Sequence, residues 1–268
     1  MNAQFTPAGK VIVVTGGASG IGRGLAERFA AEKARAVVVA DLDEAATRAV
    51  ADALPAGVER LGIALDVTDE AAVHAAVQRI EREIGPIDLW CSNAGIARGT
   101  LLGDDAEWSA SWNVHLLAHV YAARALMPAW TERGSGHMMI TASAAGLLTN
   151  MDSAPYSVTK HAAVALAEWL AIQHGDAGIG VCCLCPQGVD TPMTRRPGSQ
   201  ESATRAAGGF LQVDDVADAV LAALADGRFL VLPHPEVADY ERRRAGDRDR
   251  WLAGMRRVLA RLRATRGG

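Results

Sequence analysis

The chain has 268 residues, of which 50% are hydrophobic and 22% are charged, a composition typical of a globular protein with a large core. Its formal net charge of −4 argues against bulk electrostatic attraction to nucleic acid. No apolar run reaches the roughly 20 residues that cross a bilayer, and the first residues lack the pattern of a signal peptide. We therefore expect a cytoplasmic protein with neither a membrane span nor a nucleic-acid partner.

Short apolar runs alternate with longer amphipathic stretches along most of the chain. Strands are expected at residues 10–15, 36–41, 61–66, 87–92, 137–143 and 179–186. Helices are expected between them at 21–32, 44–53, 70–84, 106–131 and 154–174, followed by a helix–strand pair at 213–226 and 229–232. This alternation predicts a single-domain α/β fold over residues 1–268 with its core at about 8–232. The fold is a Rossmann-type, doubly wound parallel sheet of about seven strands with helices on both faces.

Two segments depart from this alternation. Residues 190–212, approximately, are rich in Thr, Pro, Arg and Gly and follow a strand end, so they are predicted to form a substrate loop; a long surface connection is the alternative.

The tail, residues 234–268, holds ten arginines and five acidic residues, and its apolar residues recur at helical spacing. We expect a C-terminal amphipathic helix that packs on this chain or on a sister subunit; a membrane surface or an acidic partner is the alternative.

The four cysteines lack further ligands at metal-binding spacing, so no metal is predicted. Three of them, Cys182, Cys183 and Cys185, fall within the strand expected at 179–186, where Cys183 and Cys185 should share one face and Cys182 the other. We interpret all four, Cys91 included, as core residues.

A glycine-rich turn connects the first strand to the first helix. Gly16 can supply a tight turn, Gly20 a close backbone approach to a pyrophosphate, and Gly22 close contact between helix and strand. The helix start, which includes Ser19 and Ile21, offers free N–H groups to phosphates. The position of the turn between strand and helix favours a dinucleotide cofactor.

Asp41 ends the second strand, nineteen residues after Gly22. A carboxylate there can accept both hydroxyls of the adenosine ribose and would repel a 2′-phosphate. No basic residue stands at Ser19 or at Leu42 to hold such a phosphate, which favours NAD over NADP. Asp41 could instead cap the following helix, although Asp43 is better placed for that role.

A serine, a tyrosine and a lysine form the candidate catalytic group. Ser143 ends a strand, and Tyr156 and Lys160 are four residues apart on one helix face. The phenol of tyrosine has an ordinary pKa of about 10, and a neighbouring lysine cation favours the phenolate. Ser143 could hold a substrate oxygen while Tyr156 transfers a proton.

Over roughly residues 8–232 the chain resembles the short-chain dehydrogenase/reductase family. The motifs that carry the resemblance, in the family's order, are Thr15-Gly16-x-x-x-Gly20-Ile21-Gly22, Asp66-Val67, Asn93-Ala94-Gly95, Asn113, Ser143 and Tyr156-x-x-x-Lys160. The resemblance implies that Asp66, aided by the Val67 backbone, contacts the adenine amino group. It also implies that Asn93, Ala94 and Gly95 line the cofactor and steady the sheet.

For catalysis, the resemblance implies that Lys160 hydrogen-bonds the nicotinamide ribose in addition to lowering the pKa of Tyr156. Asn113 would hold a water that connects Lys160 to solvent. The resemblance also implies a homodimer or homotetramer built on the two long helices expected at 106–131 and 154–174. Both helices carry small residues that permit close approach. We expect the histidines in the helical patterns to be non-catalytic, since no partner carboxylate or metal-ligand cluster accompanies them: His115, His119, His161 and His174.

One motif departs from the family's pattern. After the sixth strand the family has Pro-Gly-x-Val-x-Thr, whereas this chain has Gln187 between Pro186 and Gly188; Val189 and Thr191 keep positions that suit the nicotinamide carboxamide. Gln187 adds bulk near the reacting ring, which bears on substrate shape. The residues expected to line a substrate pocket are mostly apolar: Ile96, Leu147, Leu148, Met151, Gln187 and Met193.

Together these features predict an NAD(H)-dependent oxidoreductase that interconverts a secondary alcohol and a ketone, with Tyr156 as the acid/base and an apolar small molecule as substrate. The alternative is a non-catalytic NAD(H)-binding sensor or scaffold on the same fold.

Overall fold

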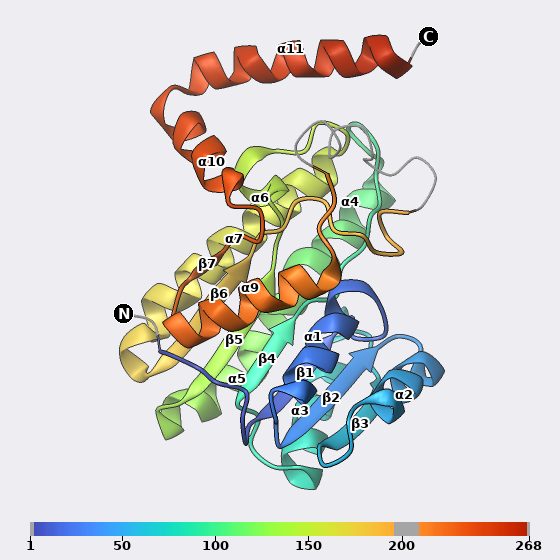
Figure 1. The fold of residues 1–268 in the computed structure, drawn as a ribbon, viewed down its shortest axis with the longest axis vertical. Helices are drawn as coiled ribbons and strands as arrows, with labels where there is room; N and C mark the ends of the chain where they lie inside the picture. The colour runs from blue at the N-terminus through green and yellow to red at the C-terminus, as the bar shows by residue number, and fades with distance from the viewer. Residues whose placement is uncertain (1–2, 196–208, 267–268) are drawn as a thin grey trace.

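The computed structural model describes residues 3–195 and 209–266. Seven parallel strands form one sheet in the order β3-β2-β1-β4-β5-β6-β7 (Figure 1). Their bounds are β1 Val11–Thr15, β2 Ala36–Asp41, β3 Glu59–Ala64, β4 Leu89–Ser92, β5 Gly136–Thr141, β6 Ile179–Leu184 and β7 Leu230–Val231. Strand β1 pairs with both β2 and β4. Strands β2 and β3 are therefore added on one side of β1, and β4 to β7 on the other. The Rossmann-type sheet is therefore confirmed, with its topological switch point beside β1.

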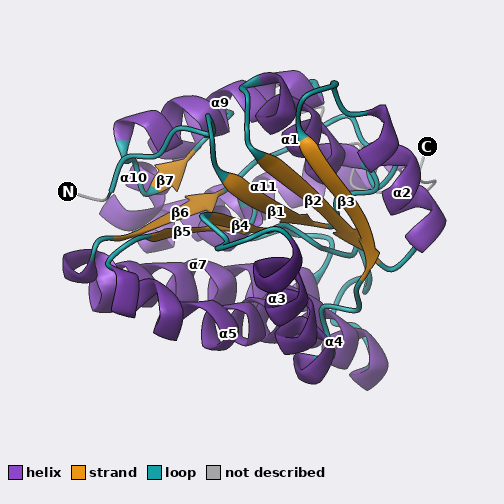
Figure 2. Cartoon of the chain, turned by 90° about the horizontal axis from the view of Figure 1, so that it is seen from below, coloured by secondary structure: helices purple, strands orange, loops and turns teal. Residues whose placement is uncertain are grey.

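Helices cover both faces of the sheet. The larger ones are α1 Gly20–Ala31, α2 Glu44–Ala53, α3 Glu70–Glu83, α5 Ala118–Arg133, α7 Ala154–His174 and α9 Val213–Asp226. Figure 2 shows α3, α5 and α7 on one face and α1, α2 and α9 on the other. Side chains alternate along β1, so Val11 and Val13 enter the first core while Ile12 and Val14 enter the second.

The cysteines follow the same alternation. Cys183 and Cys185 belong to one core and have their sulfur atoms 3.7 Å apart, while Cys182 belongs to the other. Cys91 lies in the same core as Cys182, and all four are free and buried. Their predicted structural placement is confirmed.

Most expected elements occur with bounds shifted by two residues or fewer, but one expected helix is divided. The stretch predicted as a helix over 106–131 comprises α4 Asp105–Trp112, a π-helical turn η1 Asn113–Leu117, and α5. A π-turn takes one more residue per hydrogen-bonded loop than an α-helix, so it rotates the following side chains away from the faces that a regular helix predicts. Two further short helices, α6 Ala145–Leu148 and the 3₁₀ turn η2 Gly175–Ala177, were not anticipated.

The tail forms two helices, α10 Glu236–Gly246 and α11 Arg248–Arg266, instead of one. Asp247 separates them with an extended backbone, and its side chain accepts a hydrogen bond from the N–H of Arg250. We call α10 and α11 together the C-terminal arm. Tyr240 and Trp251 of the arm pack against the first core, as expected for a tail that docks on its own chain. In Figure 1 α11 crosses the end of the molecule above α6.

Among the described helices, none is both long and apolar enough to cross a membrane.

Candidate active site

A cavity of about 1420 Å³ lies at the carboxyl ends of the strands, where doubly wound sheets place their ligands. All of the residues predicted to bind the cofactor line this cavity: Gly16, Ser19, Gly20, Ile21, Gly22, Asp41, Leu42, Asp66, Val67, Asn93, Ala94, Gly95, Tyr156, Lys160, Pro186, Gly188, Val189 and Thr191. Ser143 lines it too. Segments far apart in the sequence thus meet in one space, as the motifs predicted.

Two glycines of the glycine-rich turn stand where a side chain would collide with the backbone. Gly16 has a φ of +64°, and a β-carbon there would lie 2.8 Å from the Cα atom of Ala94. A β-carbon on Gly22 would lie 2.1 Å from the carbonyl oxygen of Gly16. Ser19 precedes α1 without a side-chain capping bond, so the first N–H groups of the helix remain available to an anion. The turn therefore fits a pyrophosphate.

Two carboxylates stand at the other end of this part of the cavity. Asp41 accepts hydrogen bonds from the N–H of Ala18 at 3.1 Å and of Leu42 at 2.8 Å, which ties the end of β2 to the glycine-rich turn. Asp66 accepts from the N–H and the hydroxyl of Thr68, at 2.9 and 2.7 Å. Backbone N–H groups thus hold both carboxylates on the cavity wall.

Asn93 connects three strands below the cavity. Its N–H donates to the hydroxyl of Thr15 at 2.9 Å, and its Nδ2 donates to the Thr15 carbonyl at 3.0 Å. Its Oδ1 accepts from the hydroxyl of Thr141 at 3.0 Å. The side chain of Asn93 thus joins the ends of β1, β4 and β5.

Ser143, Tyr156 and Lys160 gather on the opposite wall. The Ser143 hydroxyl donates to the carbonyl of Pro186 at 3.3 Å and accepts from the N–H of Ala145 at 3.1 Å, where α6 begins. The Ser143 side chain lowers the pKa of Tyr156, which places its hydroxyl near the phenol. Tyr156 lies in the first turn of α7, and the Lys160 Nζ lies 5.8 Å from the centre of its ring.

Burial dominates the electrostatics of this wall. Lys160 is buried, which lowers the pKa of its ammonium group to about 8, and its Nζ donates to the Thr141 carbonyl at 2.9 Å. Burial also raises the pKa of Tyr156, and the Ser143 side chain opposes that rise. The expected lowering of the Tyr156 pKa by Lys160 stays a prediction.

Two of the predicted site residues lie outside the cavity. Asn113 begins η1, its side chain is exposed, and it does not line the cavity. Leu147 packs in the first core, while its neighbour Leu148 lines the cavity. Both differences arise in short irregular helices, where the direction of a side chain cannot be inferred from a regular period.

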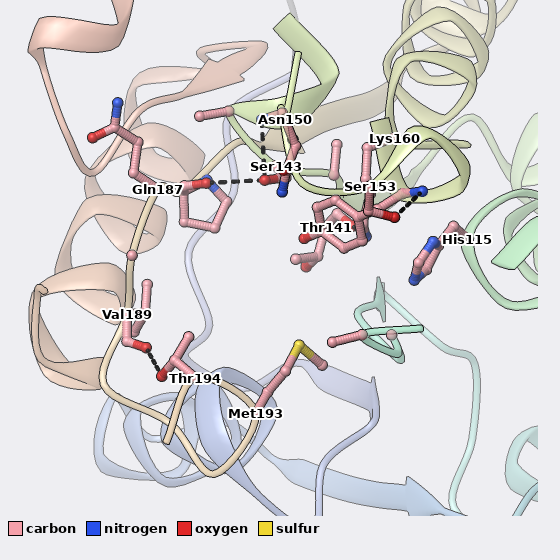
Figure 3. Close-up of a pocket in the computed structure, with 18 of the residues that line it drawn as sticks. His115, Thr141, Ser143, Asn150, Ser153, Lys160, Gln187, Val189, Met193 and Thr194 are labelled. Carbon is pink, nitrogen blue, oxygen red and sulfur yellow. Dashed lines mark hydrogen bonds between the residues drawn. The ribbon is translucent and has the colours of Figure 1, made fainter. Parts of the chain in front are cut away.

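The other predicted substrate residues line the cavity: Ile96, Leu148, Met151, Gln187 and Met193. Figure 3 shows Met193 extending into the central space and the Gln187 amide directed away from Ser143 and Lys160. The N–H of Gln187 donates to His234 at 3.2 Å. Residues 196–208 of the expected substrate loop lie outside the described residues.

Sequence reasoning missed two contributions to the cavity. One is the arm, from which Tyr240, Trp251, Met255 and Val258 line the space. The other is His115, which is buried two residues beyond Asn113 and lines the cavity beside Lys160 (Figure 3). A buried polar side chain in an apolar helix requires a partner, and that signal applies to His115 as much as to Asn113.

Comparisons with known proteins agree with this geometry. The family model for short chain dehydrogenases matches residues 10–202. The chain is 35% identical over 240 residues to a 1-deoxy-11-beta-hydroxypentalenate dehydrogenase of Streptomyces exfoliatus, covering 85% of this chain and 84% of that protein. It is 32% identical over 189 residues to the 3-oxoacyl-(acyl-carrier-protein) reductase FabG of Escherichia coli, covering 70% and 76%.

Among solved structures, a short chain dehydrogenase/reductase of Burkholderia phymatum in complex with NAD superposes with a TM-score of 0.82 at 32% identity, covering 91% of this chain and 96% of that one. The chain therefore belongs to the short-chain dehydrogenase/reductase family of oxidoreductases, as its sequence motifs predicted.

Proposed function

We propose that the protein is an NAD(H)-dependent oxidoreductase that interconverts a secondary alcohol and a ketone on an apolar substrate, with Tyr156 as the acid/base. The observation that carries the proposal is that Ser143, Tyr156 and Lys160 line one cavity together with the glycine-rich turn. A nicotinamide cofactor, when bound, supplies or accepts the hydride.

The chain's own residues would place the substrate and move its proton. Ser143 is held by Pro186 and Ala145, so its hydroxyl can orient a substrate oxygen with little rearrangement. The Tyr156 hydroxyl gives a proton to that oxygen in reduction, and the Tyr156 phenolate takes the alcohol proton in oxidation. The Lys160 ammonium, buried nearby, stabilises the phenolate that remains after reduction.

The preference for NAD rests on Asp41. Its two carboxylate oxygens already accept backbone N–H groups, which holds the negative charge at the end of β2 on the cavity wall. A 2′-phosphate at that position would meet like charge. Fluorescence titration with NADH and NADPH tests this, and preference for NADPH would overturn it.

The apolar substrate class rests on the lining of the cavity. Ile96, Leu148 and Met193 come from the body of the molecule, and Trp251 and Met255 come from the arm. These apolar side chains, which line the cavity together with Arg243, Arg250 and Arg257 of the arm, favour a hydrophobic alcohol or ketone over a sugar. A screen of secondary alcohols with NAD, graded by chain length and polarity, would identify the substrate class.

The central experiment is Tyr156→Phe, which removes only the hydroxyl and should lower kcat by about 10²–10⁴-fold while NADH still binds. Tyr121→Phe is the matched control, because Tyr121 packs against the core and lies outside the cavity. Full activity in Tyr156→Phe would refute the mechanism. Tight NADH binding without turnover across the wild-type screen would favour the sensor or scaffold instead.

We also propose a homodimer or homotetramer built on α5 and α7. Three large apolar side chains of α7, Val158, Trp169 and Ile172, are 46%, 54% and 78% exposed in the single chain. Apolar residues clustered along an exposed helix favour an interface. A monomeric mass by light scattering at micromolar concentration would contradict this.

A further inference from the structure

His115 is a buried polar residue on the cavity wall that the mechanism above does not use. It lies in the middle of η1, its side chain is 0% exposed, and it faces α7. Turns of the π type frequently occur at functional sites, because the added residue redirects a side chain. Here the turn leaves Asn113 exposed and directs His115 inward.

The imidazole of His115 contacts three separate segments. Its Nδ1 lies 2.9 Å from the hydroxyl of Thr159, in α7. Its Nε2 lies 3.1 Å from the N–H and 3.0 Å from the carbonyl oxygen of Ile96, in the loop after β4. Its ring meets the ring of Tyr156 edge to face, with 5.4 Å between the ring centres.

Both ring nitrogens find partners while the imidazole is neutral. In one tautomer Nδ1–H donates to Thr159, whose hydroxyl donates to the Pro155 carbonyl at 2.7 Å, and Nε2 accepts from the N–H of Ile96. In the other tautomer the Thr159 hydroxyl donates to Nδ1, and Nε2–H donates to the Ile96 carbonyl. Burial, followed by the charges of Lys160 and His119, lowers the pKa of His115 well below its usual value, which keeps the ring neutral.

We propose that His115 is a positioning residue that fixes the ring of Tyr156 relative to the loop after β4. The loop matters because Asn93, Ala94 and Gly95, which immediately precede Ile96, line the part of the cavity predicted to hold the cofactor. Tyr156 belongs to α7, so its distance from that loop depends on contacts between the two elements. The imidazole supplies such a contact. Its Nδ1 bonds α7 through Thr159, its Nε2 bonds the loop through Ile96, and its ring packs against the phenol of Tyr156.

The inference rests on the proposed reaction, in which Tyr156 must hold a proton within reach of the substrate oxygen. A displacement of about 1 Å in such a group can lower a rate by about 100-fold. His115→Phe keeps a flat ring beside Tyr156 and removes both hydrogen bonds, so we expect kcat to fall by about 10- to 100-fold. His115→Gln keeps a donor and an acceptor and should retain more activity than His115→Phe.

A matched control is available one turn along the same segment. His119 is equally buried and its Nδ1 lies 2.6 Å from the Ser92 hydroxyl, but it does not line the cavity. His119→Phe should lower the melting temperature while leaving kcat near that of the wild type. An equal loss of kcat in His119→Phe and His115→Phe would mean that the effect is general destabilisation, and would overturn the proposal.

The decisive measurement combines His115→Phe with Tyr156→Phe. If His115 acts through Tyr156, the double variant loses little beyond Tyr156→Phe, and His115→Phe alone displaces the tyrosine limb of the pH profile of kcat. Additive losses with an unchanged pH profile would overturn the proposal. Full activity in Tyr156→Phe would instead refute the proposed reaction, so the two failures are distinguishable.

If His115→Phe does not fold, Thr159→Val removes the partner of Nδ1, together with the bond of that hydroxyl to the Pro155 carbonyl, and leaves the imidazole in place. The same non-additivity with Tyr156→Phe is then expected, and its absence counts against His115.

Discussion

Replacing Gly22 by alanine places a methyl group where the backbone of the glycine-rich turn closes on α1. The new carbon would lie 2.1 Å from the Gly16 carbonyl oxygen and 2.6 Å from Nδ2 of Asn93. A comfortable contact is about 3.5 Å, so the turn and the helix must separate by about 1 Å or more. Overpacking of this kind costs about 1–3 kcal/mol. If about half of a cost near 3 kcal/mol falls on the phosphate-binding turn, the Kd for NADH should rise about tenfold, which corresponds to about 1.4 kcal/mol.

The assay for Gly22→Ala is fluorescence titration with NADH, accompanied by thermal unfolding. The melting temperature should fall by roughly 2–4 °C for each kcal/mol of strain. Gly175→Ala is the control, because a β-carbon there meets nothing within 4 Å and the residue lies beyond α7, away from the cavity. Wild-type NADH affinity in Gly22→Ala would refute the assignment of this turn to the pyrophosphate.

Three further predictions concern the cofactor, the arm and the acid/base. Asp41→Asn removes the charge that a 2′-phosphate would meet and should narrow the preference for NADH over NADPH by about tenfold or more, whereas Asp43→Asn, which affects only the cap of α2, should not. Trp251→Ala should raise KM for apolar substrates without changing NADH affinity. The adjacent Leu252, 50% exposed and outside the cavity, provides the control Leu252→Ala. Because burial raises the pKa of Tyr156, its acid form persists above neutral pH; ketone reduction should therefore hold its rate through neutral pH while alcohol oxidation rises with pH, and the reverse pattern would contradict this acid/base assignment.

The regular part of the fold could be predicted because burial on both faces leaves a strong periodic pattern. The helices at Glu44–Ala53, Ala154–His174 and Val213–Asp226 begin and end where their caps and apolar period place them. Strand β3 begins two residues earlier than expected. It lies at the sheet edge with Glu59 and Arg60 exposed, so it lacks the apolar run that marks the inner strands.

The candidate site also contains residues whose position could be predicted from the sequence and residues whose position could not. Residues at strand ends and helix starts, such as Asp41, Ser143 and Tyr156, could be placed because sheet topology alone brings them to one edge. Asn113 could not, because a π-turn has no clear sequence signature and one added residue changes which side chain faces inward. The arm could be recognised as amphipathic, but which surface its apolar stripe covers depends on the break at Asp247, which a helical period does not reveal.

The position of the arm bears on how the protein should be produced for kinetic work. An affinity tag on the carboxyl terminus would extend from α11, the helix whose Trp251, Met255 and Val258 line the cavity. At the other end of the chain, the carbonyl of Ala3 accepts a hydrogen bond from His137 at 3.0 Å, near the start of β5. That is the edge of the sheet opposite the cavity, so an amino-terminal tag would stay clear of substrate. The KM for substrate should therefore differ between the two tagged forms, and the amino-terminally tagged form is the appropriate reference.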